Sequence, residues 1–100
     1  MPLTPQSQLR IWLVQTLGGM GGKARRDAAL RAMEKAFHGR FTEEDWRSPE
    51  KHPNEPNWAN RTSYERAAMV REGLLEPVNS AGYGQWALTG KGWALYRRLR

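Results

Sequence analysis

Three prolines within eight residues, Pro49, Pro53 and Pro56, place the strongest constraint on how this chain can fold. Proline has no backbone N–H and disrupts both helices and central strands, so regular structure cannot run through this region. We therefore expect a long irregular connection over residues 40–57, with the regular elements on either side of it.

The segment before this connection has the pattern of two helices. Apolar residues recur at three- and four-residue steps over residues 6–17, after Pro5, and again over residues 23–37. This spacing places the apolar side chains on one face of each helix, and the glycines at 18–19 and 39 are expected to end them. Thr42, followed by three acidic residues, predicts a short helical piece that ends near Trp46.

The segment after the connection predicts a third helix, a hairpin and a final helix. The third helix is expected to begin at Trp58 or Asn60 and to end at Glu72. A helical projection assigns its residues to an apolar side (Tyr64, Ala68, Met69) and an outward polar side (Thr62, Ser63, Arg66, Val70). Two short apolar runs, 74–78 and 85–88, are expected to pair around a flexible tip. Thr89 is expected to cap a helix over 90–99, with Trp93, Ala94 and Tyr96 against the core.

This order of elements predicts a mainly α fold with a small β-hairpin: a winged helix-turn-helix with three helices, a hairpin wing and a C-terminal helix. The 100 residues suffice for one domain, so we expect a single domain over 1–100. No apolar run approaches the roughly 20 residues of a membrane-spanning helix, and the start lacks the pattern of a secretory signal. With no cysteine for disulfides, a cytoplasmic protein without membrane association is expected.

The charge of the chain favours a polyanionic partner. The formal net charge is +6 and the sequence pI is about 10.3. Basic residues gather in 23–38 and 77–100, whereas acidic residues collect in the middle of the chain. This segregation predicts a basic side of the molecule, and double-stranded DNA is the expected partner.

The second half of the chain also carries a specific pattern. A helix that opens with Asn60-Arg61 and an aromatic three residues on ends in Gly73-Leu74-Leu75, and Gly84-Gln85-Trp86-Ala87-Leu88-Thr89-Gly90-Lys91-Gly92 follows. The pattern resembles the amino-terminal winged-helix domain of Mrr-type restriction proteins. The resemblance spans most of residues 5–97 and is specific from Trp58 onward.

The resemblance implies DNA binding within a restriction or defence system, including the sensing of methylated bases for a nuclease or other effector domain. The 100 residues contain no counterpart of the family's nuclease domain. The loop from Arg40 to Asn57 is also more acidic and richer in proline than that family predicts.

The third helix is the element expected to enter the DNA major groove, because an α-helix fits that groove and Arg pairs bidentately with guanine. Arg66 is the expected base contact. Further expected DNA contacts come from the same helix (Asn60, Thr62, Ser63), from the start of the second helix (Lys23, Arg25, Arg26), and from the wing and last helix (Tyr83, Lys91). The alternative is a solvated helix face, with Glu65 and Glu72 paired to Arg61 and its neighbours.

Two tryptophans, Trp46 and Trp58, flank the irregular connection. They could line a pocket for a methyl group or an extruded base, or pin the loop to the core. Pinning is the interpretation that we favour.

Catalytic and metal-binding patterns are missing from the sequence. His38 and His52 lack the spacing of zinc ligands, and the glycines at 18–22 lack the spacing of a nucleotide-binding loop. We therefore expect no enzymatic activity, no metal and no cofactor. The alternative functions are a winged helix that binds a protein partner through the acidic, Trp-bearing loop, and a small transcriptional regulator.

Overall fold

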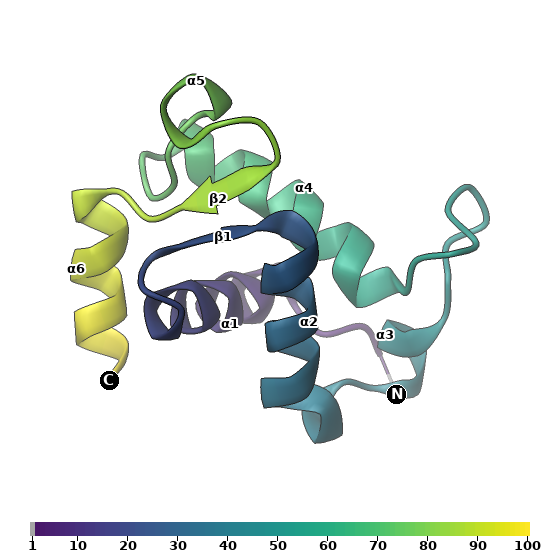
Figure 1. The fold of residues 1–100 in the computed structure, drawn as a ribbon. Coiled ribbons are helices and arrows are strands. Elements are labelled where there is room, and N and C mark those ends of the chain that lie inside the picture. The colour runs from purple at the N-terminus through teal and green to yellow at the C-terminus, as the bar shows by residue number, and fades with distance from the viewer. Residues whose placement is uncertain (1) are drawn as a thin grey trace.

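The structure is a computed structural model that describes residues 2–100 and is mainly helical, with a small two-stranded antiparallel sheet (Figure 1). This confirms the predicted fold class at that level. The elements in chain order are α1 (Gln6–Gly19), β1 (Lys23–Arg25), α2 (Arg26–Phe37), the 3-10 helix η1 (His38–Arg40), α3 (Glu43–Trp46), α4 (Asn57–Arg71), α5 (Val78–Ala81), β2 (Gln85–Ala87) and α6 (Gly90–Leu99).

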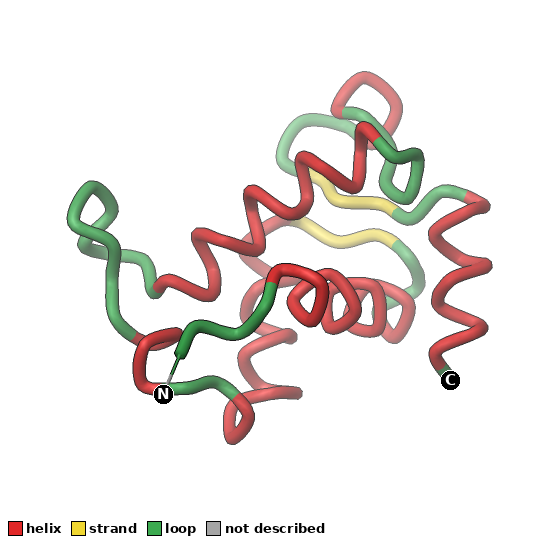
Figure 2. Tube along the Cα trace, turned by 180° about the vertical axis from the view of Figure 1, so that it is seen from behind, coloured by secondary structure: helices red, strands yellow, loops and turns green. Residues whose placement is uncertain are grey.

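Helix α1 is the centre of the fold. It lies between α2 and α6 and packs against α4 along a further side, as Figures 1 and 2 show from opposite directions. Its buried apolar side chains are Leu9, Trp12, Leu13, Val14 and Leu17. Removing this apolar surface from water is the main force that holds the surrounding helices in place.

The first three residues of the predicted second helix form a strand instead. Lys23–Arg25 pairs antiparallel with Gln85–Ala87, and Ala24 lies opposite Trp86. Gly21 and Gly22 have positive φ, which turns the chain out of α1 into this strand. The prediction of a helix from Lys23 was therefore wrong at its start, because pairing with a distant segment overrides the local helical propensity.

The predicted hairpin is reduced to one bridge. Leu75 pairs with Leu88, and the N–H of Glu76 donates to the carbonyl of Ala87 at 2.8 Å. Pro77 follows, and without an N–H it cannot continue the ladder. The next residues form the helical turn α5, so the expected pairing of 74–78 with 85–88 was wrong beyond Glu76.

Helix α6 approaches the body closely. The hydroxyl of Thr89 accepts from the N–H of Gly92 at 3.0 Å, which confirms the predicted cap. A Cβ added at Gly92 would lie 2.2 Å from the carbonyl oxygen of Leu74, so a larger residue does not fit there. Trp93 and Tyr96 pack partly buried against the core, as predicted.

Helix α3 confirms the predicted short helix and depends on a buried carboxylate. Thr42 and Asp45 form a capping box, and Asp45 also accepts from the N–H (2.8 Å) and hydroxyl (2.5 Å) of Thr4. Burial alone would raise the pKa of Asp45, but the hydrogen bonds from Thr4 and Thr42 outweigh it and lower that pKa. Asp45 thereby ties the N-terminal segment to α3.

Candidate nucleic-acid interface

The buried side of α4 differs from the one that we predicted. Its buried stripe follows helical spacing and consists of Trp58, Thr62, Glu65 and Met69, with Ala59 beside it. The hydroxyl of Thr62 donates to the carbonyl of Trp58 at 2.6 Å, so this polar side chain is satisfied inside the core. Thr62 is fully buried and cannot contact DNA, whereas Tyr64, expected in the core, is 65% exposed.

Arg66 does not occupy the centre of the outward side either. It follows Glu65 of the buried stripe and is partly buried itself. Its Nε atom is buried without a hydrogen-bond partner among residues 2–100. The expectation that the outward side is centred on Arg66 was wrong, because the helical projection was turned toward the wrong face; a base contact by Arg66 stays a prediction.

The side of α4 opposite the buried stripe is exposed or partly exposed. It carries four residues at helical spacing, which we call the outward ridge: Asn60, Tyr64, Ala67 and Arg71. Arg71 forms no ion pair within residues 2–100. The outward ridge therefore offers an amide, a phenol and a guanidinium, and no carboxylate.

Glu65 of α4 and Glu72, the residue that follows its last residue, are held on the flank toward α1 by a single side chain, Arg10. The Nε of Arg10 lies 2.5 Å from an oxygen of Glu65, and its two Nη atoms donate to the oxygens of Glu72 at 2.8 and 2.6 Å. These hydrogen bonds, first of all that of Glu72, raise the pKa of Arg10, and Arg10 in turn lowers the pKa of Glu72. The alternative interpretation, in which these acids pair with Arg61, is not what the structure shows, since both pair with Arg10 and Arg61 donates to the carbonyl of Thr4.

Three elements meet at Arg26, the first residue of α2. Its backbone N–H donates to the carbonyl of Gly84 at 3.0 Å, next to β2. Its guanidinium donates to the hydroxyl of Ser63 on α4, at 3.2 Å from Nε and 2.9 Å from Nη2. The start of α2, the 82–84 loop and the middle of α4 are therefore held side by side.

The other predicted phosphate contacts lie around this junction, in places that differ from the prediction. Lys23 and Arg25 are the exposed residues of β1 rather than part of a helix start. Tyr83, at the tip before β2, is 95% exposed. Lys91 is exposed, but its Nζ donates to the carbonyl of Glu72 at 3.0 Å. This places a cation at the C-terminal end of α4, where it is stabilised by the helix dipole.

Trp46 and Trp58 belong to one aromatic cluster. Phe41 stacks on Trp58 with ring centroids 4.5 Å apart and meets the edge of Trp46 at 5.6 Å. The two tryptophans are 6.1 Å apart in an edge-to-face arrangement, and Trp58 is 2% exposed. The rings fill the space between them, which agrees with pinning of the loop and leaves no pocket for a base between Trp46 and Trp58.

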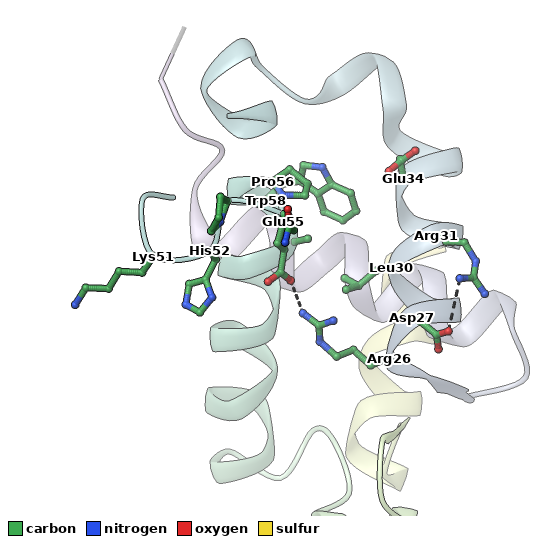
Figure 3. A pocket seen from close by; sticks show the side chains of 13 residues that line it. Arg26, Asp27, Leu30, Arg31, Glu34, Lys51, His52, Glu55, Pro56 and Trp58 are labelled. Atoms are coloured by element: carbon green, nitrogen blue, oxygen red, sulfur yellow. Dashed lines mark hydrogen bonds and ion pairs between the residues drawn. The ribbon is translucent and has the colours of Figure 1, made fainter. Parts of the chain in front are cut away.

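A separate groove lies between α2 and the segment 51–59 (Figure 3). Its volume is about 550 Å³, and Leu30 and Trp58 contribute to its apolar lining. Arg26 reaches from the α2 side and forms an ion pair with Glu55 on the opposite side. Acidic and basic side chains alternate around the rim, so the groove as a whole has no single sign of charge.

Comparisons add no relative that would name the function: no family model, curated protein or solved structure matches this chain. Across residues 2–100, no three His, Cys, Asp or Glu side chains gather as metal ligands would. Within the same residues, none of the helices has the length and apolar character needed to cross a bilayer. The geometry around α4 is therefore the basis for a functional proposal.

Proposed function

We propose that this chain is a winged-helix domain that binds double-stranded DNA and places the outward ridge of α4 in the major groove. The observation that carries the proposal is the charge distribution along α4: Arg10 holds Glu65 and the C-cap residue Glu72 on one flank, and the outward ridge is free of carboxylates. Asn60 and Arg71 are residue types that pair bidentately with adenine and guanine, and an α-helix matches the width of the groove.

The surroundings of α4 support the same proposal. The contacts of Arg26 with Gly84 and Ser63 hold β1 and the 82–84 tip beside α4. Lys23, Arg25 and Tyr83 are exposed there and suit contacts with phosphates on either side of the groove. The net charge of +6 adds a sequence-independent attraction that weakens as salt rises.

The resemblance to Mrr-type domains supports a narrower form of this proposal, in which the domain targets a nuclease or another effector to methylated DNA. Binding to methylated and plain duplexes of equal sequence tests it. Tighter binding to the methylated duplex is the expected result, and equal affinity across a library of methylated sites would remove this narrower form. The binding of duplex DNA itself does not depend on that outcome.

The test of DNA binding is a fluorescence anisotropy titration of a labelled duplex at low salt with wild type and two charge-reversal variants. Arg71→Glu changes the outward ridge, and Lys35→Glu makes the same charge change in the last turn of α2, at the other end of that helix from Arg26 (Figure 1). We expect Arg71→Glu to lower affinity about tenfold or more, and Lys35→Glu to lower it by no more than about threefold. Absence of duplex binding by wild type, or equal losses in the two variants, would reject the proposal.

A further inference from the structure

Within the groove between α2 and segment 51–59, the ion pair of Arg26 with Glu55 joins α2 to the loop that precedes α4 (Figure 3). The side chain of Arg26 is 43% exposed and that of Glu55 is 25% exposed. Arg26 is therefore accessible from solvent while its charge is already paired. Arg26 lies beside the proposed DNA-binding surface, yet its positive charge is neutralised by Glu55 of the same chain. This pairing needs an explanation.

We infer that Arg26, oriented by Ser63, is a binding site for a DNA phosphate, and that the carboxylate of Glu55 occupies this site in the free protein. The inference rests on the proposed function. Carboxylate and phosphodiester groups both present oxygens that accept hydrogen bonds from the planar guanidinium, so one can replace the other without a change in the arginine.

The position of Arg26 favours a phosphate as the second ligand. Its hydrogen bonds to Ser63 place the guanidinium on the flank of α4 toward α2, beside the turn of the helix that also carries Tyr64 of the outward ridge. Its backbone N–H donates to the carbonyl of Gly84, which follows the exposed Tyr83. A duplex that lies on the outward ridge and reaches the 82–84 tip therefore passes close to Arg26. Ser63 accepts from both Nε and Nη2, which fixes the direction of the guanidinium and makes Ser63 a positioning residue.

The loop that carries Glu55 can release Arg26 without unravelling. The ends of the loop are joined by a hydrogen bond of 2.6 Å from the N–H of Asn57 to the carbonyl of Arg47, and the side-chain amide of Asn57 donates to the carbonyl of Glu44 at 2.9 Å. Within residues 2–100, Glu55 is the only side chain of segment 48–56 that forms a hydrogen bond or ion pair with α2. Since a partly exposed ion pair contributes little to stability, a phosphate can compete with it.

The experiment compares Glu55→Gln with Glu50→Gln in the anisotropy titration with the labelled duplex. Glu50 lies in the same loop, is exposed and forms no ion pair within residues 2–100, so both variants remove one negative charge from the loop. If Glu55 competes with phosphate for Arg26, Glu55→Gln binds the duplex about two- to fivefold more tightly than Glu50→Gln. Circular dichroism and thermal melting show whether both variants keep the wild-type fold.

Arg26→Gln completes the test as a double-mutant cycle. The advantage of Glu55→Gln over Glu50→Gln is expected to vanish when Arg26→Gln is present in both proteins. Equal affinities of the two loop variants, or an advantage that persists without Arg26, would overturn the inference and leave the DNA-binding proposal intact. Absence of duplex binding by wild type would reject that proposal and this inference together.

Discussion

Two arginines stand on opposite flanks of α4 and hold carboxylates in different ways. Arg10 forms ion pairs with Glu65 of α4, which is 8% exposed, and with Glu72, which caps the C-terminal end of that helix. Arg26 forms an ion pair with a single carboxylate, Glu55, which belongs to an irregular loop. Its guanidinium also donates a hydrogen bond to the hydroxyl of Ser63. The ion pairs of the first arginine join α1 to α4 and its C-cap, whereas the ion pair of the second joins α2 to a loop.

The difference shows how the surroundings of an ion pair decide what it does. A charge inside the protein that loses its partner is strongly unfavourable, so the Arg10 cluster is a permanent part of the structure. A partly exposed pair returns to water at little cost, so the Arg26 pair can be exchanged for another anion. Helix α4 is therefore fixed on its flank toward α1 and adjustable on its flank toward α2.

The largest expected effect comes from breaking the fixed side. Arg10→Met leaves the buried Glu65 without a partner, and we expect it to lower the free energy of unfolding by about 3 kcal/mol. Arg26→Gln is expected to lower it by less than about 1 kcal/mol, because that pair is partly exposed. Urea denaturation of both variants measures the two values, and the comparison fails if they are equal. The double variant Arg10→Met with Glu65→Leu is expected to recover part of the loss.

Asp45 offers a comparison with the carboxylates that pair with arginine, because it is a buried carboxylate without an arginine partner within residues 2–100. It is fully buried, and within residues 2–100 its hydrogen-bond donors are neutral groups of Thr4 and Thr42. Asp45→Asn replaces an acceptor by a donor that faces these N–H groups, so we expect a loss of about 2 kcal/mol in the same urea experiment. A loss below about 0.5 kcal/mol would show that α3 does not depend on this carboxylate.

A smaller effect is expected in the pH dependence of stability. The folded protein lowers the pKa of Glu72, chiefly through its hydrogen bonds with Arg10, and that of Asp45. The stabilisation from these groups is therefore complete above their unfolded pKa values and is lost as the pH falls through the lowered folded values. Urea midpoints measured from about pH 6 to about pH 2 should fall with pH.

The pH series also tests whether Arg10 causes the lowered pKa of Glu72. Glu72→Gln and Arg10→Met should each flatten the fall, since both remove the same bond. An acid slope identical to wild type in Glu72→Gln would contradict the assignment to Arg10.

The two threonine helix caps were the part of the fold that the sequence predicted best. Thr42 and Thr89 were recognised as caps because a hydroxyl that accepts from the helix start is a local interaction, and both cap as predicted. Helix α1 runs through Gly18 and Gly19, two residues beyond its predicted end, so these glycines did not stop it where expected. The prolines at 49–56, like the caps, act locally and exclude regular structure through the backbone itself. Such signals do not depend on the rest of the chain.

The orientation of α4 could not be predicted in the same way. Its buried stripe includes Thr62 and Glu65, which are residue types found mostly at protein surfaces. They are buried because Thr62 bonds to the backbone and Glu65 meets Arg10, which lies 55 positions away in the sequence. The candidate site therefore differs from the predicted one. Asn60 belongs to both, whereas Thr62 and Arg66 are no longer at its centre. Tyr64 and Arg71 are new members. The spacing of Trp58 and Met69, which differ by three helical turns, was the signal that could have found this face.

The short strand at Lys23–Arg25 was missed for a related reason. Its residues favour a helix, and only the pairing with Gln85–Ala87, about sixty positions later, makes them extended. A three-residue strand leaves too little alternation of apolar and polar residues to be detected locally.

The hydrogen bond between Asn57 and Arg47 has a consequence for how this domain can be changed. Because the two ends of segment 48–56 already touch, the intervening nine residues form an appendage that a tight turn could replace while every helix stays in place. Lengthening, shortening or deleting this appendage would adjust how readily Arg26 accepts a new anion, and the packing around α1 would not have to be rebuilt.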